Sequence, residues 1–86
     1  MDHAFDIADP RQDERGDYLN FTIRDGATLI PGRISGPAMR ILASGSGHSA
    51  SEVFSANKSK IRSAAYKSRR FNPTLAMIFL GTGDFS

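Results

Sequence analysis

The stretch ANKSKIRSAAYKSRRF (residues 56–71) contains six Lys or Arg residues in sixteen positions. Side chains of this kind bind the phosphates of nucleic acids. At about 100° per residue along a helix, three of these bases line up with a tyrosine, whose ring could stack on an exposed base. We call this row the basic ridge: Lys58, Arg62, Tyr66 and Arg69. Together with Arg70 it is the predicted phosphate-contacting set.

The same stretch has a plainer interpretation as the polar side of a surface helix. Lysine and arginine are good helix formers, and their charge suits the C-terminal end of a helix. That interpretation also predicts acidic residues for i, i+4 pairs, and none occurs between Val53 and Asn72. The missing acids favour binding, yet we prefer a solvated or arm-covered helix face and keep nucleic-acid binding second.

Charge is distributed unevenly along the chain. Residues 1–25 hold seven acids against three arginines, whereas residues 26–86 hold eight bases against Glu52 and Asp84, so the formal net charge of +2 conceals two opposite parts. Such a division indicates either an anionic partner for the basic part or an acidic arm that lies against it.

Other chemistries find little support in the sequence. The two imidazoles, His3 and His48, are far apart and lack the ligand spacing of a metal site. SGSGHSAS precedes a helix but lacks the lysine and spacing of a phosphate-binding loop. The serines around His48 have no positioned base. We therefore expect no enzyme activity, no metal and no cofactor.

Composition limits the setting and the size of the fold. Eighty-six residues suffice for one hydrophobic core, and without cysteine no disulfide or thiolate site can support it. No apolar run approaches the roughly 20 residues that span a bilayer. The first residues are acidic and lack the basic region followed by an apolar region that is typical of a signal peptide. We expect a cytoplasmic protein that does not enter membranes.

Hydrophobic alternation predicts a hairpin in the first half. Leu19, Phe21 and Ile23 alternate with polar residues, and Asp25-Gly26 is a two-residue turn signal. A second strand follows over residues 27–34, with Thr28, Ile30 and Ile34 on one face. Pro31 and Gly32 predict that it lies at an edge or contains a bulge.

Helices and a last strand are predicted in the second half. A short helix begins after Ser35 as N-cap, with Met39, Ile41 and Leu42 on its apolar side. Ser49 and Glu52 form a capping box for one long helix that ends at Asn72-Pro73. Its predicted apolar stripe is Val53, Phe54, Ile61, Ala64 and Ala65. Residues 74–80, apolar on both faces, predict a central strand.

These elements predict an α+β fold in one domain. The expected order is strand, strand, helix, helix, strand, giving a small, mainly antiparallel sheet of three or four strands with two helices on one face. Residues 18–86 form this domain. Residues 1–17 are expected to be an N-terminal arm or a short edge strand, with loop from Pro10 onward.

The chain resembles a small bacterial family, domain of unknown function 1488. The resemblance rests on short elements spread over nearly the whole chain: Ile7 with Asp9-Pro10, Phe21, Asp25-Gly26, Ile34-Ser35 with Ala38-Met39, then Phe54, Asn57, Ile61, Ala64-Ala65, Leu80 and Asp84-Phe85. It implies a compact α+β domain of this topology and assigns no activity, because the family is itself uncharacterised. Gly32-Arg33 and the more basic helix depart from the family pattern.

The function that the sequence favours is binding without catalysis. A strand with two apolar faces and one layer of helices leaves a surface for another protein or a second copy of the chain. The alternative is an accessory nucleic-acid-binding protein that contacts phosphates through the basic ridge and Arg70. The two differ in salt dependence, because only phosphate binding weakens steeply as ionic strength rises.

Overall fold

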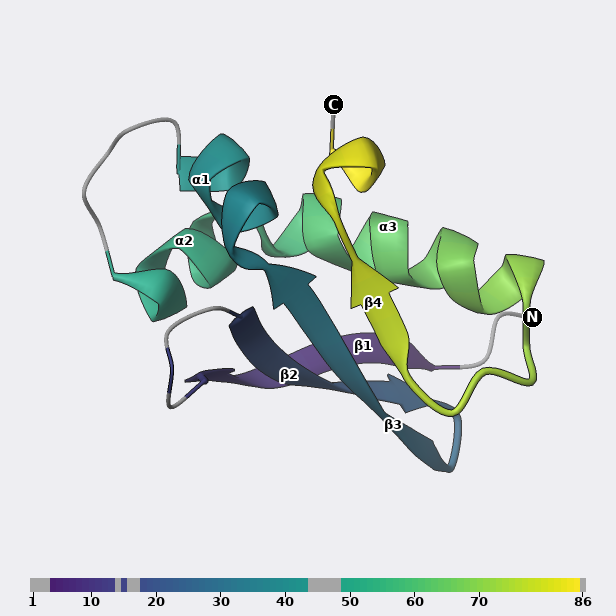
Figure 1. The fold of residues 1–86 in the computed structure, drawn as a ribbon. Helices are drawn as coiled ribbons and strands as arrows, with labels where there is room; N and C mark the ends of the chain where they lie inside the picture. The colour runs from purple at the N-terminus through teal and green to yellow at the C-terminus, as the bar shows by residue number, and fades with distance from the viewer. Residues whose placement is uncertain (1–3, 14, 16–17, 44–48, 86) are drawn as a thin grey trace.

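The computed structural model describes residues 4–13, 15, 18–43 and 49–85. Four strands form one sheet in the order β1-β2-β3-β4, and three helices pack on one face of it (Figure 1). The elements are β1 (Phe5–Gln12), β2 (Tyr18–Asp25), β3 (Thr28–Ser35), α1 (Gly36–Ala43), α2 (Ala50–Ala56), α3 (Lys58–Phe71), β4 (Ile78–Leu80) and the 3-10 turn η1 (Thr82–Asp84). The predicted α+β class is confirmed, with one helix more than expected.

The predicted hairpin is present as β2 and β3. Leu19, Phe21 and Ile23 are all buried, as their alternation with polar residues predicts. The turn is shifted by one residue, because Asp25 pairs with Thr28 and the loop consists of Gly26 and Ala27. Of these two loop residues only Gly26 has a positive φ, 63°, which fits a turn with glycine in the first central position.

The N-terminal strand β1 is longer than the sequence indicates. It pairs antiparallel with β2 along its length and places Phe5 and Ile7 in the core. We expected the chain to leave the sheet at Asp9-Pro10. Instead the register shifts between Ala8 and Arg11, and Asp9 has a φ of 56°. Asp9-Pro10 thus forms a bulge, and pairing with β2 continues at Arg11 and Gln12.

Gly32 permits a close contact between β2 and β3. It pairs with Phe21, and a Cβ atom at this position would come within 2.5 Å of the Phe21 ring. The glycine therefore makes room for a buried aromatic ring. The edge position or bulge predicted for this strand is not found, because β3 lies between β2 and β4 and its register with β2 is continuous through Pro31. Pro31 is accommodated because β4 pairs only with Gly32 to Ile34, so β3 has one neighbour at the proline.

Helix α1 begins as expected but buries a different set of residues. The Ser35 Oγ accepts a hydrogen bond from the Ala38 N–H at 3.2 Å, which confirms the N-cap. Ala38 and Leu42, one turn apart, are buried and Met39 packs partly against the core. Ile41 was expected on the apolar side and is instead exposed, because the packed face is centred on residues 38 and 42.

The predicted long helix is broken at Asn57 into α2 and α3. The capping box is confirmed, since the Ser49 side chain accepts from the Glu52 N–H and Glu52 accepts from the Ser49 N–H. The Asn57 Nδ2 donates to the carbonyl oxygens of Val53 at 2.9 Å and Leu42 at 3.3 Å. The Leu42 carbonyl lies in the last turn of α1, where it has no partner within that helix. The Asn57 side chain therefore links the end of α1 to α2, and the helix is interrupted at Asn57.

The break leaves the apolar stripe intact. All five predicted residues, Val53, Phe54, Ile61, Ala64 and Ala65, are buried. The helix also ends where Asn72-Pro73 predicts, with Asn72 as C-cap. The stripe therefore packs α2 and α3 on the sheet as the periodicity requires.

The last strand does not have the expected position. Residues 74–80 were predicted as a central strand, but β4 spans only Ile78–Leu80 and lies at the edge of the sheet, parallel to β3. Ile78 and Leu80 are buried under the helices, whereas Phe79 points to the opposite face and is half exposed. The apolar residues before it, Leu75 and Met77, are also exposed.

Candidate binding surfaces

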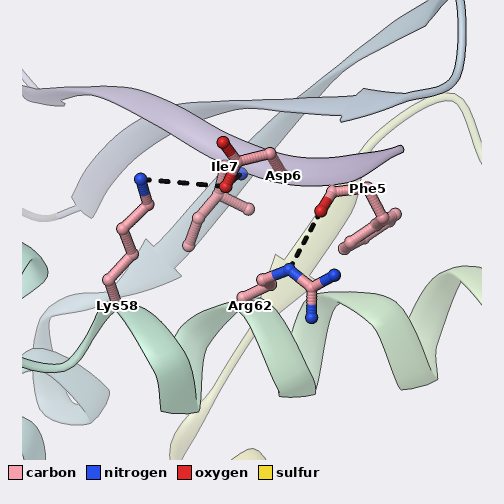
Figure 2. Close-up of polar contacts among 5 residues, drawn as sticks. All are labelled: Phe5, Asp6, Ile7, Lys58 and Arg62. Atoms are coloured by element: carbon pink, nitrogen blue, oxygen red, sulfur yellow. Dashed lines mark hydrogen bonds and ion pairs between the residues drawn. The ribbon is translucent and has the colours of Figure 1, made fainter.

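The first half of the basic ridge, Lys58 and Arg62, is exposed yet contacts β1 (Figure 2). The Arg62 Nε donates to the Phe5 carbonyl oxygen at 2.9 Å, and its guanidinium lies 5.6 Å from the Phe5 ring centroid. The Lys58 Nζ is 3.7 Å from Asp6 Oδ1, which also accepts from the Ile7 N–H. The first half of the ridge thus binds the backbone and a carboxylate of an edge strand.

The second half of the ridge has protein partners too. The Tyr66 ring packs edge-on against Phe5 with centroids 5.0 Å apart. The Arg69 Nε lies 2.6 Å from Asp25 Oδ2, and both side chains are largely buried. Arg69 also donates to the Pro73 carbonyl oxygen. The ion pair fixes the C-terminal half of α3 to the β2–β3 turn.

Arg70 lies beside the ridge with its charge exposed. Its Nη1 donates to the Tyr66 hydroxyl at 3.1 Å, and its guanidinium lies 5.7 Å from the Tyr66 ring centroid. The hydrogen bond to Tyr66 raises the pKa of Arg70 above its ordinary value. Like any arginine side chain, the guanidinium is cationic at physiological pH.

The geometry agrees with the interpretation of α3 as an arm-covered face. The N-terminal residues that lie against it form the bulged strand β1, and Asp6 and Asp25 supply the acids that the helix lacks. All four ridge residues contact β1 or the β2–β3 turn. A role for them and Arg70 in phosphate binding stays a prediction, and it would require these contacts to be shared with a ligand.

A second part of α3 was not singled out by the sequence pattern. Lys60 and Lys67, with Ser63, Ser68 and Phe71, line an open groove of about 630 Å³ that Asp84 and Phe85 close on the other side. Phe71 is 94% exposed. On a helical wheel, Lys60, Lys67 and Phe71 fall within about 40° of one another, a signal that was available in the sequence.

The face of the sheet away from the helices carries a third surface, which we call the outer face. The Arg33 Nε donates to Asn20 Oδ1 at 3.0 Å, and the Arg33 guanidinium lies 5.0 Å from the Tyr18 ring centroid. The rings of Tyr18 and Phe79 meet edge-on at 5.7 Å. Arg33 pairs with both Asn20 and Phe79 in the strand register, so three neighbouring strands contribute to one cluster.

The described part of the chain offers neither a metal site nor a membrane-spanning helix. The described residues contain no group of three His, Asp or Glu side chains that could hold a metal ion, and both His3 and His48 lie outside them. In the same part of the chain, no helix is long and apolar enough to cross a membrane. Phe85 packs against the core, and the Asp84 carboxylate accepts from the N–H of Gly81, the N-cap of η1, at 2.8 Å.

The fold and these surfaces define a two-layer α+β domain in which no described helix covers the outer face of the sheet. No protein-family model, curated protein or solved structure matches the chain. The resemblance to domain of unknown function 1488 therefore stays a prediction.

Proposed function

We propose that the protein acts by binding another protein chain through its outer face, without catalysing a reaction. The observation that carries this proposal is the cluster of Tyr18, Arg33 and Phe79 on a sheet face that no described helix covers. Tyrosine and arginine are the residues that most often dominate the energy of protein interfaces. Here they are already held in place by contacts with Asn20 and with each other, which lowers the entropy lost on binding.

The edge strand β4 extends this surface. Phe79 is 50% exposed at the sheet edge, and the exposed side chains of Leu75 and Met77 precede it. The other edge is less suited to pairing, because β1 carries a bulge and a proline and its Phe5 carbonyl already accepts from Arg62. The open edge at β4 is therefore the place where a partner strand or loop would join.

The partner to test first is a second copy of this chain. Residues 73–83 contain no charged side chain, so two copies of the β4 edge can meet without like charges facing each other. The apolar strip of Leu75, Met77 and Phe79 would face its own equivalent across a two-fold axis. The strip is short, so we expect a dimer that forms only at micromolar concentration or above.

Sedimentation velocity over a concentration series tests the proposal. Phe79→Ser should shift the self-association toward monomer by roughly ten-fold or more in Kd, because it removes the exposed ring at the centre of the contact. Leu29→Ser is the matched control: Leu29 is also exposed on the outer face, at the hairpin tip away from β4. Equal effects of the two variants, or a monomer at every concentration, would reject self-association through β4.

Nucleic-acid binding is the second candidate, and the charge distribution favours it. Eight bases against two acids in residues 26–86 give this part of the chain a positive field. The basic ridge supports it less well, because its side chains already have partners within the protein. The cytoplasmic location that the sequence predicts is part of the same proposal, for either kind of partner.

A further inference from the structure

The groove beside α3 has features of a ligand site that the outer face lacks. Lys60 and Lys67 lie two helical turns apart, about 10 Å along the axis, on the same wall of the groove. The hydroxyls of Ser63 and Ser68 line the wall between and beside them. The lining therefore combines two cations with hydrogen-bond donors over a length of helix.

The two lysines differ from the ridge bases in their charge partners. Among the described residues neither Lys60 nor Lys67 has an ion pair, in contrast to Lys58 and Arg69 on the ridge. One acid, Asp84, also lines the groove, and its Oδ2 accepts the Gly81 N–H at 2.8 Å. The groove thus has an excess of positive charge that a bound polyanion would compensate.

Phe71 adds an aromatic platform at the end of the lysine row. Its ring is 94% exposed at the last position of α3. A second hollow on its other side is lined by Tyr66, Lys67 and Arg70. A flat ring that is open to solvent and flanked by cations is an arrangement on which bases stack while phosphates contact the neighbouring charges.

We infer that this groove binds a single strand of nucleic acid, with phosphates on Lys60 and Lys67 and a base stacked on Phe71. The positive charge of the groove favours a polyanion as ligand. The exposed Phe71 ring favours a polyanion whose aromatic faces are free to stack. A duplex hides its base faces, and an acidic peptide offers carboxylates without a stacking partner. The site is separate from the outer face, so it does not depend on self-association through β4.

Fluorescence anisotropy with a short labelled oligo-dT or oligo-U, across a salt series, tests this inference. A duplex of the same length and a poly-glutamate peptide are the competing polyanions. Lys60→Gln with Lys67→Gln should weaken single-strand binding by roughly ten-fold or more and reduce the log–log salt slope by about 1.4, at about 0.7 per phosphate contact. The charge-matched control is Arg24→Gln with Arg40→Gln, two exposed bases that lie outside both the groove and the basic ridge.

The Phe71→Ser variant tests the contribution of base stacking to affinity, because it removes the ring and leaves the charge of the groove unchanged. Because the ring is almost fully exposed, the variant should keep its fold while losing at least about five-fold in single-strand affinity and nothing in duplex affinity. Circular dichroism checks the fold of each variant. The inference is overturned by absence of single-strand binding at low salt, by equal losses in the groove and control variants, by insensitivity to Phe71→Ser, or by tighter binding of the duplex or the acidic peptide.

Discussion

Arg62 of α3 and Phe5 of β1 are joined twice, once through the backbone and once through the ring. The Arg62 Nε donates to the Phe5 carbonyl oxygen at 2.9 Å, and the guanidinium lies 5.6 Å from the ring centroid (Figure 2). Phe5 begins the edge strand of the sheet. The arginine therefore closes part of an edge that would otherwise present an unpaired carbonyl to other chains.

We expect Arg62→Met to lower the free energy of unfolding by about 1–2 kcal/mol. The variant keeps an aliphatic stem but loses a charged hydrogen bond and a cation–π contact. Lys60→Met removes the same charge from the same helix, from a residue without a hydrogen bond or ion pair in the described structure, and should change the stability by less than about 0.5 kcal/mol. Urea unfolding of both variants measures the difference. Equal losses would mean that Arg62 acts only through its charge.

The sequence could not show which part of the protein the basic ridge faces. A helical wheel places Lys58, Arg62, Tyr66 and Arg69 together, but it does not say what lies opposite them. That depends on β1, which pairs with β2 and so brings Asp6 and Phe5 under α3. The acidic N-terminal part of the chain pointed to such a cover, and the bulge at Asp9 concealed how long the covering strand is.

Local sequence patterns predicted which elements form better than they predicted which elements lie side by side. The alternation in β2, the capping box at Ser49 and the stripe on α2 and α3 each arise within a few residues, and all three are found in the fold. The edge position of β4 is decided by its parallel pairing with β3, which no property of residues 74–80 reveals. Their apolar character on both faces reflects burial of Ile78 and Leu80 and exposure of Phe79.

Asn57 is a position where tertiary contacts override helix continuity, and two substitutions test it. Asn57→Ala should cost about 1 kcal/mol, because the Leu42 carbonyl loses a donor while alanine favours the helix. Asn57→Asp should cost more, about 2 kcal/mol, since it places an acceptor against the carbonyls of Leu42 and Val53. Thermal unfolding followed by circular dichroism gives both values.

Asn72→Asp is the matched control for the charge that Asn57→Asp introduces. The Asn72 Oδ1 accepts from the Thr74 hydroxyl at 2.9 Å, a bond that aspartate can also accept. Asn72→Asp should therefore cost less than about 1 kcal/mol, the unfavourable effect of an acid at a helix C-terminus. If the two aspartate variants are equally stable, Asn57 does not depend on its donor group and the helix break has another cause.

Gly32→Ala should destabilise the fold although alanine is the better strand residue on conformational grounds. The added Cβ would lie 2.5–2.8 Å from three atoms of the Phe21 ring, which is buried and has no room to move away. Overpacking of this kind costs about 1–3 kcal/mol. Gly81→Ala, where nothing lies within 4 Å of the new atom, should change stability by less than about 0.5 kcal/mol.

Combining Gly32→Ala with Phe21→Leu relieves the clash, so the double variant should be more stable than the sum of the two single losses predicts. Additive losses in chemical denaturation would show that Gly32 is required for its backbone and not for the space that it leaves to Phe21.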